Sequence, residues 1–197
     1  MRAPHVFLDP ITAGVWIATY LLWIIPEIAI SRRRPEKDAP KVDRGSKIAV
    51  IAAVNLGIFL GFIVADFVPR FSMRADWKAV FALGIAVWLG GICLRLYSVR
   101  TLGRFFTTGV TISNGQRIVE QGPYRWLRHP SYLGGLLALA GFGMTLTNWL
   151  AMFLPVCCLA AAYAYRIRVE EQALVRGLGP AYSEYMQRTW RLIPYVF

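Results

Sequence analysis

Acidic residues, cysteines and histidines are all scarce in this sequence, and each shortage excludes a class of site. The chain has 11 acidic residues, three cysteines and two histidines among 197 residues. The cysteines, Cys93, Cys157 and Cys158, lie inside apolar runs without the spacing of metal ligands. We therefore expect no metal site and no disulfide framework, and we expect all three to be small buried hydrophobic side chains.

Charged residues as a whole are also few. They make up 17% of the chain, against 56% hydrophobic residues, whereas a soluble domain holds about 25% charged residues. The net charge of +11 could favour nucleic acid, but the basic residues flank apolar runs and no nucleic-acid motif accompanies them. We therefore expect a membrane protein that contacts membrane lipids and does not bind nucleic acid.

Long apolar runs fill much of the chain and predict its fold. A run of about 20 residues can cross the hydrocarbon of a bilayer as a helix, and a shorter one can be tilted or partly embedded. The fold class expected is an all-α integral membrane protein with about five transmembrane helices, of which the fourth is short. The runs lie at 11–30, 48–68, 77–97, 132–146 and 149–165.

The basic residues predict the orientation of these helices. Seventeen Lys and Arg lie in 31–47, 98–130 and 166–197, and four lie on the other side of the predicted spans. The positive-inside rule places the larger set in the cytosol. The N-terminus is then outside, and because no small-residue cleavage site follows the first run, we expect that run to be a retained helix.

The chain divides into two regions by these criteria. Residues 1–97 hold three N-terminal transmembrane helices, and residues 98–197 hold the polar segments. Within the second region, only two residues separate the last two runs, which predicts an antiparallel helical hairpin at 130–168. A final amphipathic helix is expected in the cytosolic tail at 170–188, broken at 177–180.

A polar segment, GQRIVEQGPYRWLRHPSYLGG, interrupts the apolar pattern at 115–135. Pro130 suits the first turn of a helix and His129 its N-cap, so backbone N–H groups there can bind an anion. A second polar cluster, Arg166 and Glu170, has its members four residues apart on one helix face. Because the hairpin brings its two ends together, we expect both clusters to meet on the cytosolic side of the membrane.

Three stretches resemble the isoprenylcysteine carboxyl methyltransferase family in order and spacing. They are GPYRWLRHPSYLGG at 122–135, RIRVEEQAL at 166–174 and GPAYSEYMQRTWRLIP at 179–194. The same stretches are similar to those of the related phospholipid N-methyltransferases. The resemblance covers about the C-terminal half, from Gly115 onward. It implies an integral membrane methyltransferase that uses S-adenosylmethionine and methylates a lipophilic isoprenoid or lipid acceptor.

The resemblance also implies which residues form the site. Arg166 would hold the carboxylate of the acceptor, and Arg128, beside the predicted anion site, is the second candidate catalytic residue. The donor would be bound by the loop ahead of the RHP-x-Y element, by that element and by one glutamate of the acidic pair. The residues so implied are Gln116, Arg117, Ile118, Val119, Tyr124, His129, Pro130, Ser131, Tyr132 and Glu170.

The nature of the acceptor and of the activity has alternatives. A carboxylate acceptor is already ionised, whereas an amine must first lose a proton, and no dedicated base stands out in the sequence. This favours a carboxylate or thiolate acceptor over an amine, and we expect the carboxylate of a prenylcysteine-like or other isoprenoid or lipid substrate in preference to an aminophospholipid. The acidic run at 169–172 is shorter than the one frequent in prenylcysteine enzymes, which keeps a phospholipid N-methyltransferase open. Membrane reductases that use NADPH share a similar C-terminal half, and a non-catalytic membrane protein is the last alternative.

Overall fold

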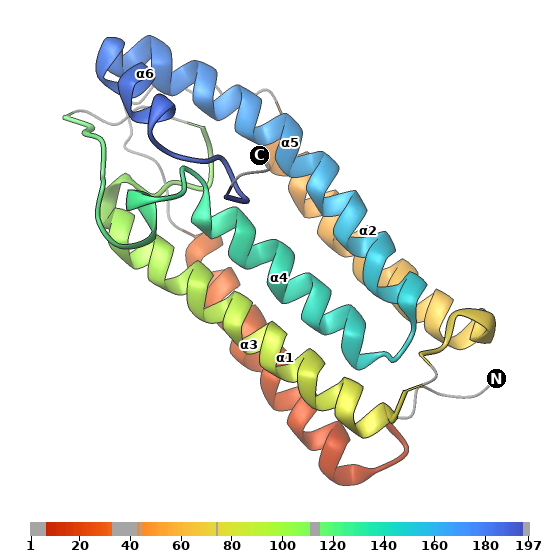
Figure 1. The fold of residues 1–197 in the computed structure, drawn as a ribbon. Helices are drawn as coiled ribbons and strands as arrows, with labels where there is room; N and C mark the ends of the chain where they lie inside the picture. The colour runs from red at the N-terminus through yellow and green to blue at the C-terminus, as the bar shows by residue number, and fades with distance from the viewer. Residues whose placement is uncertain (1–6, 33–42, 44, 74, 111–114, 195–197) are drawn as a thin grey trace.

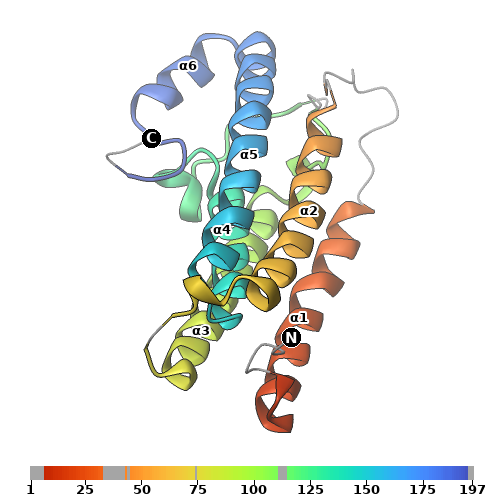
Figure 2. The ribbon, with the colours of Figure 1, turned by 90° about the vertical axis from the view of Figure 1, so that its right-hand side faces the viewer.

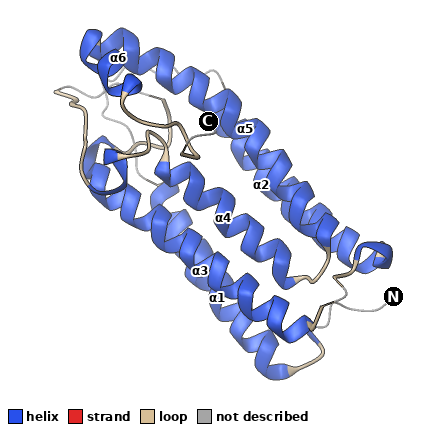
Figure 3. Cartoon of the chain, viewed as in Figure 1, coloured by secondary structure: helices blue, strands red, loops and turns tan. Residues whose placement is uncertain are grey.

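Helices make up the ordered architecture of the protein. The computed structural model describes residues 7–32, 43, 45–73, 75–110 and 115–194, so most of the basic linker at 31–47 lies outside the described residues. Figure 3 shows helices joined by loops, with no strand in the described part of the chain, and the predicted all-α fold is confirmed. The long helices are α1 (Pro10–Ser31), α2 (Ser46–Phe67), α3 (Trp77–Leu102), α4 (Pro130–Thr145), α5 (Trp149–Leu178) and α6 (Pro180–Gln187). Single 3-10 turns form η2 (Pro69–Phe71), η3 (Gly103–Phe105) and η4 (Gly122–Arg125).

Local signals explain where several helices begin. Asp9 precedes α1 and its carboxylate accepts the Thr12 N–H at 3.2 Å. Asn148 precedes α5, and its side-chain oxygen accepts the N–H groups of Leu150 and Ala151 at 3.0 and 3.2 Å. Each cap satisfies backbone donors that the first turn of a helix leaves without a partner. The cap at Asn148, the last residue of the three-residue connection from α4, therefore fixes the start of α5.

Within the described residues, four helices are long and apolar enough to cross a membrane: α1, α2, α3 with its 3-10 extension, and α5. Their outer faces carry large apolar side chains, such as Ile11, Leu22 and Ile25 of α1, which are 77%, 58% and 60% exposed. Such faces are stable against lipid and not against water. The chain is a multi-pass integral membrane protein. Because α4 has only 16 residues, a fifth full span stays a prediction.

Close contact of backbones joins α3 and α4, which run side by side in Figures 1 and 2. A Cβ atom added to Gly91 of α3 would lie 2.3 Å from the backbone nitrogen of Ala138 of α4. One added to Gly141 would lie 2.3 Å from the nitrogen of Trp88. Small residues let membrane helices approach in this way without a side-chain layer between them. Aromatic rings fill the space beside this pair, where Trp88 and Phe142 meet edge to face at 5.4 Å.

Two expectations from the sequence are corrected by the fold. First, α5 does not end near 168 but continues to Leu178, so the tail helix expected from 170 is the last part of α5 followed by α6. The break itself is confirmed at Gly179, which has φ +62°, and Pro180 starts α6. Second, the cysteines are not buried: Cys93 and Cys157 are exposed on the bundle surface, where lipid can cover an apolar side chain.

One end of the bundle gathers the polar segments. The last turns of α3 and α5 and the first turn of α4 lie there, and α6 and the tail lie beside the end of α5 (Figures 1 and 2). The tail is fastened to the segment before α4 by backbone hydrogen bonds between Trp190 and both Trp126 and Arg128, at 3.0 and 2.8 Å. This end of the molecule therefore holds the segments that the sequence predicts to meet.

Candidate active site

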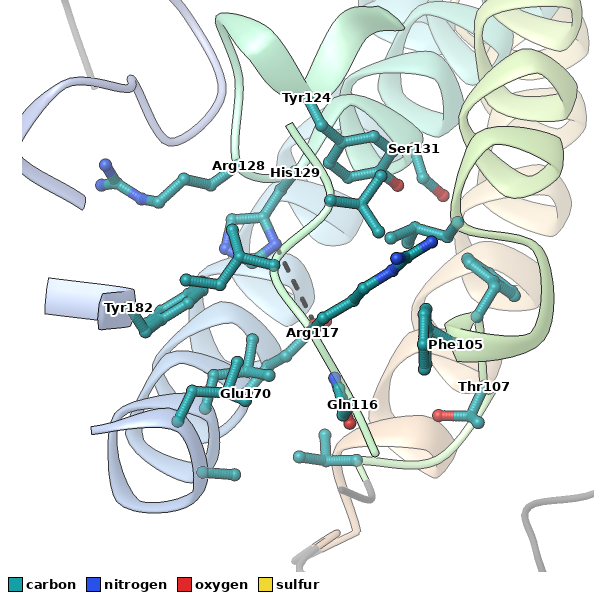
Figure 4. Close-up of a pocket in the computed structure, with 18 of the residues that line it drawn as sticks. Phe105, Thr107, Gln116, Arg117, Tyr124, Arg128, His129, Ser131, Glu170 and Tyr182 are labelled. Atoms are coloured by element: carbon teal, nitrogen blue, oxygen red, sulfur yellow. Dashed lines mark ion pairs between the residues drawn. The ribbon is translucent and has the colours of Figure 1, made fainter. Parts of the chain in front are cut away.

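A pocket opens at this end of the bundle, between the start of α4, the end of α5 and the connecting segments. Figure 4 shows its side chains converging from these elements. Nine of the ten predicted donor-binding residues line it, and Pro130 is the exception; Arg128 also lines it, whereas Arg166 does not. The structure adds residues that were not among the predicted site residues: Leu102, Phe105, Phe106, Thr107, Gly109 and Val110 on one wall, and Ala173, Leu174, Leu178, Tyr182 and Tyr185 on the other.

The missed residues had partial signals in the sequence. Tyr182 and Tyr185 belong to the third matching stretch, and their rings lie 5.8 Å apart in the wall of the pocket. Burial raises the pKa of the Tyr124 and Tyr182 hydroxyls above its ordinary value, so both are protonated donors at neutral pH. Residues 105–110 carry no recognisable motif in the sequence. Their position in the wall of the pocket is set by the path of the chain after the end of α3.

His129 begins α4 as predicted. It is the N-cap residue, with Pro130 in the first position of the helix. Its ring is 4% exposed and stacks on the Tyr132 ring, with centroids 5.3 Å apart and planes 5° apart. The two ring nitrogens face the two glutamates: Nδ1 lies 4.0 Å from Glu170 and Nε2 lies 3.4 Å from Glu171. The imidazole is thus held between carboxylates at the edge of the pocket.

Tyr132 links the two members of the second polar cluster. Its hydroxyl donates to Oε2 of Glu170 and accepts from Nε of Arg166 at 2.8 Å. Its ring also stacks on Tyr163 of α5 at 4.5 Å. The helical hairpin therefore joins the RHP-x-Y element to α5 through one side chain, and the predicted meeting of the two clusters occurs here.

Arg166 is buried immediately behind Tyr132. Its remaining donors reach the Ser46 hydroxyl at 3.2 Å and the Thr108 carbonyl at 2.8 Å, and the Asp43 carboxylate lies 3.9 Å from Nη1. The guanidinium thus joins α5 to the start of α2 and to the segment after α3. It contacts the pocket through Tyr132, and it already lies near one carboxylate.

Glu171, the second glutamate of the acidic pair, was not among the predicted site residues, and it is the centre of a separate ionic cluster. Its buried carboxylate accepts from Nε of Arg128 at 2.9 Å and from Nε of Arg191 at 3.0 Å. Arg128 also donates to the carbonyls of Met186, at 2.8 Å, and of Thr189. In Figure 4 the Arg128 guanidinium points away from the other labelled side chains. These contacts fasten the tail to α5. Arg128 therefore holds the tail in position beside the pocket.

Comparison with known sequences identifies the family. Residues 82–176 match the sequence family described as "Isoprenylcysteine carboxyl methyltransferase (ICMT) family". Protein-S-isoprenylcysteine O-methyltransferase B from Arabidopsis thaliana is 32% identical over 135 residues, which cover 68% of this chain and 68% of that protein. The chain belongs to the isoprenylcysteine carboxyl methyltransferase family. The family predicted from the three sequence stretches is thereby confirmed, and membrane reductases are disfavoured.

Two further family members define how far the likeness extends. The protein-S-isoprenylcysteine O-methyltransferase of Saccharomyces cerevisiae is 30% identical over 128 residues, which cover 64% of this chain and 54% of that protein. A solved structure of a eukaryotic intramembrane Ras methyltransferase of the family superposes with a TM-score of 0.58 at 24% identity, covering 91% of this chain and 63% of that one. The fold is therefore shared, although this chain spans only about half to two thirds of these two relatives.

Proposed function

We propose that this protein transfers a methyl group from S-adenosylmethionine to the carboxylate of a prenylcysteine-like or other isoprenoid acceptor. The observation that carries the proposal is the contact chain from Glu170 through Tyr132 to Arg166. Glu170, at one end of that chain of contacts, lines the pocket, and Arg166, at the other end, is buried. Family membership supports methyl transfer, and the names of the relatives support an isoprenylcysteine acceptor.

The residues of the pocket fit the donor chemically. S-adenosylmethionine supplies a methyl group on a sulfonium, and it also carries an ammonium, a carboxylate, ribose hydroxyls and an adenine ring. Glu170, whose side chain is 30% exposed, can accept from the ammonium or the ribose. The Tyr124 ring, which lines the pocket, offers a face that attracts a cation. Apolar side chains at Phe105 and Leu174 provide surfaces for the adenine ring.

The position of Arg166 supports an acceptor carboxylate. It lies four residues before Glu170 on α5, about 6 Å nearer the hydrocarbon at 1.5 Å per residue. An isoprenoid acceptor held in the membrane would therefore meet Arg166 before it meets Glu170. A guanidinium fork binds both oxygens of a carboxylate, and the acceptor carboxylate would take the place of the contacts that Nη1 and Nη2 make with Ser46, the Thr108 carbonyl and Asp43. The acceptor is already ionised and needs no general base.

We further propose that the pocket faces the cytosol. It lies at the end of the bundle where the basic segments 98–130 and 166–197 meet, and the positive-inside rule favours the cytosolic side for those segments. A charged, water-soluble donor would then reach the pocket from the cytosol, while the acceptor stays in the membrane.

Transfer of labelled methyl groups tests the proposal. The protein would be reconstituted in lipid vesicles with labelled S-adenosylmethionine and a panel of a prenylcysteine, an isoprenoid acid and phosphatidylethanolamine. We expect label on the carboxylate of one of the first two, as a base-labile ester. The matched control is Glu170→Gln, which should lower the rate. Label on phosphatidylethanolamine would favour the N-methyltransferase alternative, and absence of label together with NADPH binding would favour a reductase.

A further inference from the structure

Two charged side chains form an ion pair inside the bundle, apart from the residues assigned so far. Glu27 of α1 and Arg95 of α3 contact each other in a bidentate arrangement, with Nη2 of Arg95 2.8 Å from Oε2 of Glu27 and Nε donating to Oε1. Their side chains are 26% and 14% exposed. Both belong to helices that are long and apolar enough to span the membrane. Ionised groups are costly there, so an intramembrane pair marks a functional region.

The same guanidinium also holds the start of α4. Nη1 of Arg95 donates to the Ser131 hydroxyl at 3.1 Å and to the Ser131 carbonyl at 3.3 Å. Ser131 is the second residue of α4, and it lines the pocket. The backbones are in contact beside it, since a Cβ atom on Gly134 would lie 2.7 Å from the nitrogen of Arg95. Arg95 therefore lies directly against the turn that bears the pocket residues.

We infer that Arg95 is a positioning residue for the methyl-donor site and that Glu27 holds Arg95 in its working orientation. This inference rests on the proposed function. Arg95 sets the first turn of α4 through Ser131, and that turn carries the His129 and Tyr132 side chains that line the pocket. Glu27 belongs to α1, which lies outside the matched region 82–176. Because Glu27 holds Arg95, α1 supports the donor site in addition to anchoring the chain in the membrane.

The geometry of the guanidinium explains why arginine is needed. One edge, Nε and Nη2, faces Glu27, while Nη1 faces Ser131. A planar fork can serve both partners at once, whereas a lysine ammonium has one nitrogen and can serve only one of them well. Replacement by lysine should keep an ion pair with Glu27 and release Ser131. The Arg95→Lys variant therefore tests the positioning of α4 separately from the contact between α1 and α3.

Donor affinity and thermal stability, measured together, test the inference. Wild type, Arg95→Lys, Ser131→Ala, Trp16→Phe and Glu170→Gln would be reconstituted in lipid nanodiscs, with S-adenosylmethionine affinity measured by calorimetry and unfolding by tryptophan fluorescence. We expect Arg95→Lys and Ser131→Ala to raise Kd roughly 3- to 10-fold, which is the size of the loss of one typical hydrogen bond. Trp16→Phe is the matched control, because it removes a 3.0 Å bond from α1 to Thr145 far along α4 from the pocket. It should lower the unfolding midpoint and leave Kd unchanged.

A charge exchange gives the decisive comparison. The double variant with Glu27→Arg and Arg95→Glu restores attraction between α1 and α3 but removes the donor to Ser131. We expect its unfolding midpoint to exceed that of Arg95→Glu alone, while Kd stays raised. Full recovery of Kd in the double variant would overturn the inference and leave the pair as a bundle contact.

Other outcomes separate this inference from the proposed function. If Glu170→Gln weakens donor binding and Arg95→Lys does not, the inference is wrong and the proposed function stands. If Kd rises in Trp16→Phe as much as in Arg95→Lys, the effect follows general loosening of α1 and the inference is again wrong. A wild-type protein that binds no S-adenosylmethionine would overturn both.

Discussion

Exchange of either glutamate of the adjacent pair tests whether the two carboxylates have separate roles. Glu171 is 5% exposed and joins Arg128 and Arg191, whereas Glu170 faces the pocket and Tyr132. Glu171→Gln keeps the shape of the side chain and removes the charge that both arginines need. Breaking a buried ion pair from one side costs about 3–5 kcal/mol, and glutamine retains one acceptor, so we expect a loss of about 3 kcal/mol.

The size of this loss makes it measurable. In a chain of 150–250 residues, 1 kcal/mol shifts the unfolding midpoint by roughly 2–4 °C, so Glu171→Gln should lower it by about 6–12 °C. Limited trypsin digestion should also release the tail near Arg188 sooner than in wild type. Glu170→Gln is the matched control and should change donor affinity while leaving the midpoint within about 2 °C. Equal midpoints for wild type and Glu171→Gln would refute the assignment of Glu171 as the tail anchor.

Three further predictions concern packing, turnover and topology. Gly91→Ala should destabilise the bundle by about 3 kcal/mol or fail to fold, because the added Cβ meets the backbone of Ala138; unchanged unfolding would contradict the contact between α3 and α4. Arg166→Lys should bind S-adenosylmethionine nearly normally but lower the turnover number at least about tenfold, because lysine loses the bidentate grip on a carboxylate; near-normal turnover would remove the acceptor role. In intact cells, a cysteine introduced at Ser72 should react with an impermeant reagent and one at Arg188 should not; the reverse would invert the proposed orientation.

Local and hairpin features could be predicted from the sequence because short-range rules determine them. Pro130 restricts the residue before it and starts a helix, which places His129 at the N-cap. The short connection between the last two apolar runs, which occupies residues 146–148 in the structure, makes α4 and α5 antiparallel and brings Tyr132 next to Glu170 and Arg166. Helical periodicity then puts those two α5 residues on one face. Each step needs only neighbours in sequence or one tight connection.

The features that sequence analysis missed depend on contacts between distant segments. Glu171 acquires its role only when the tail folds back and presents Arg191. Arg95 acquires its role only when α1 places Glu27 beside it. The end of α5 was missed for a different reason: the segment after 168 is polar but keeps the helical period, so the sequence shows a change of environment and not a change of structure. Burial of the cysteines was wrong because hydrophobicity in a membrane protein indicates lipid contact as readily as core packing.

Depth in the membrane orders the proposed chemistry along α5. In the proposed orientation Arg166, held by Ser46 and the Thr108 carbonyl, is nearer the hydrocarbon, and Glu170 is one turn farther out, in the pocket. A lipid-borne carboxylate and a water-soluble cation would thus approach from opposite directions and meet at Tyr132, which contacts both side chains. Methyl transfer between them neutralises a negative and a positive charge, and a poorly hydrated site favours that change over the separated ions. The buried surroundings of Tyr132 and the alignment of the two substrates therefore both favour methyl transfer. The two hydrogen bonds of Tyr132, to Glu170 and from Arg166, hold the donor-binding and acceptor-binding side chains next to each other.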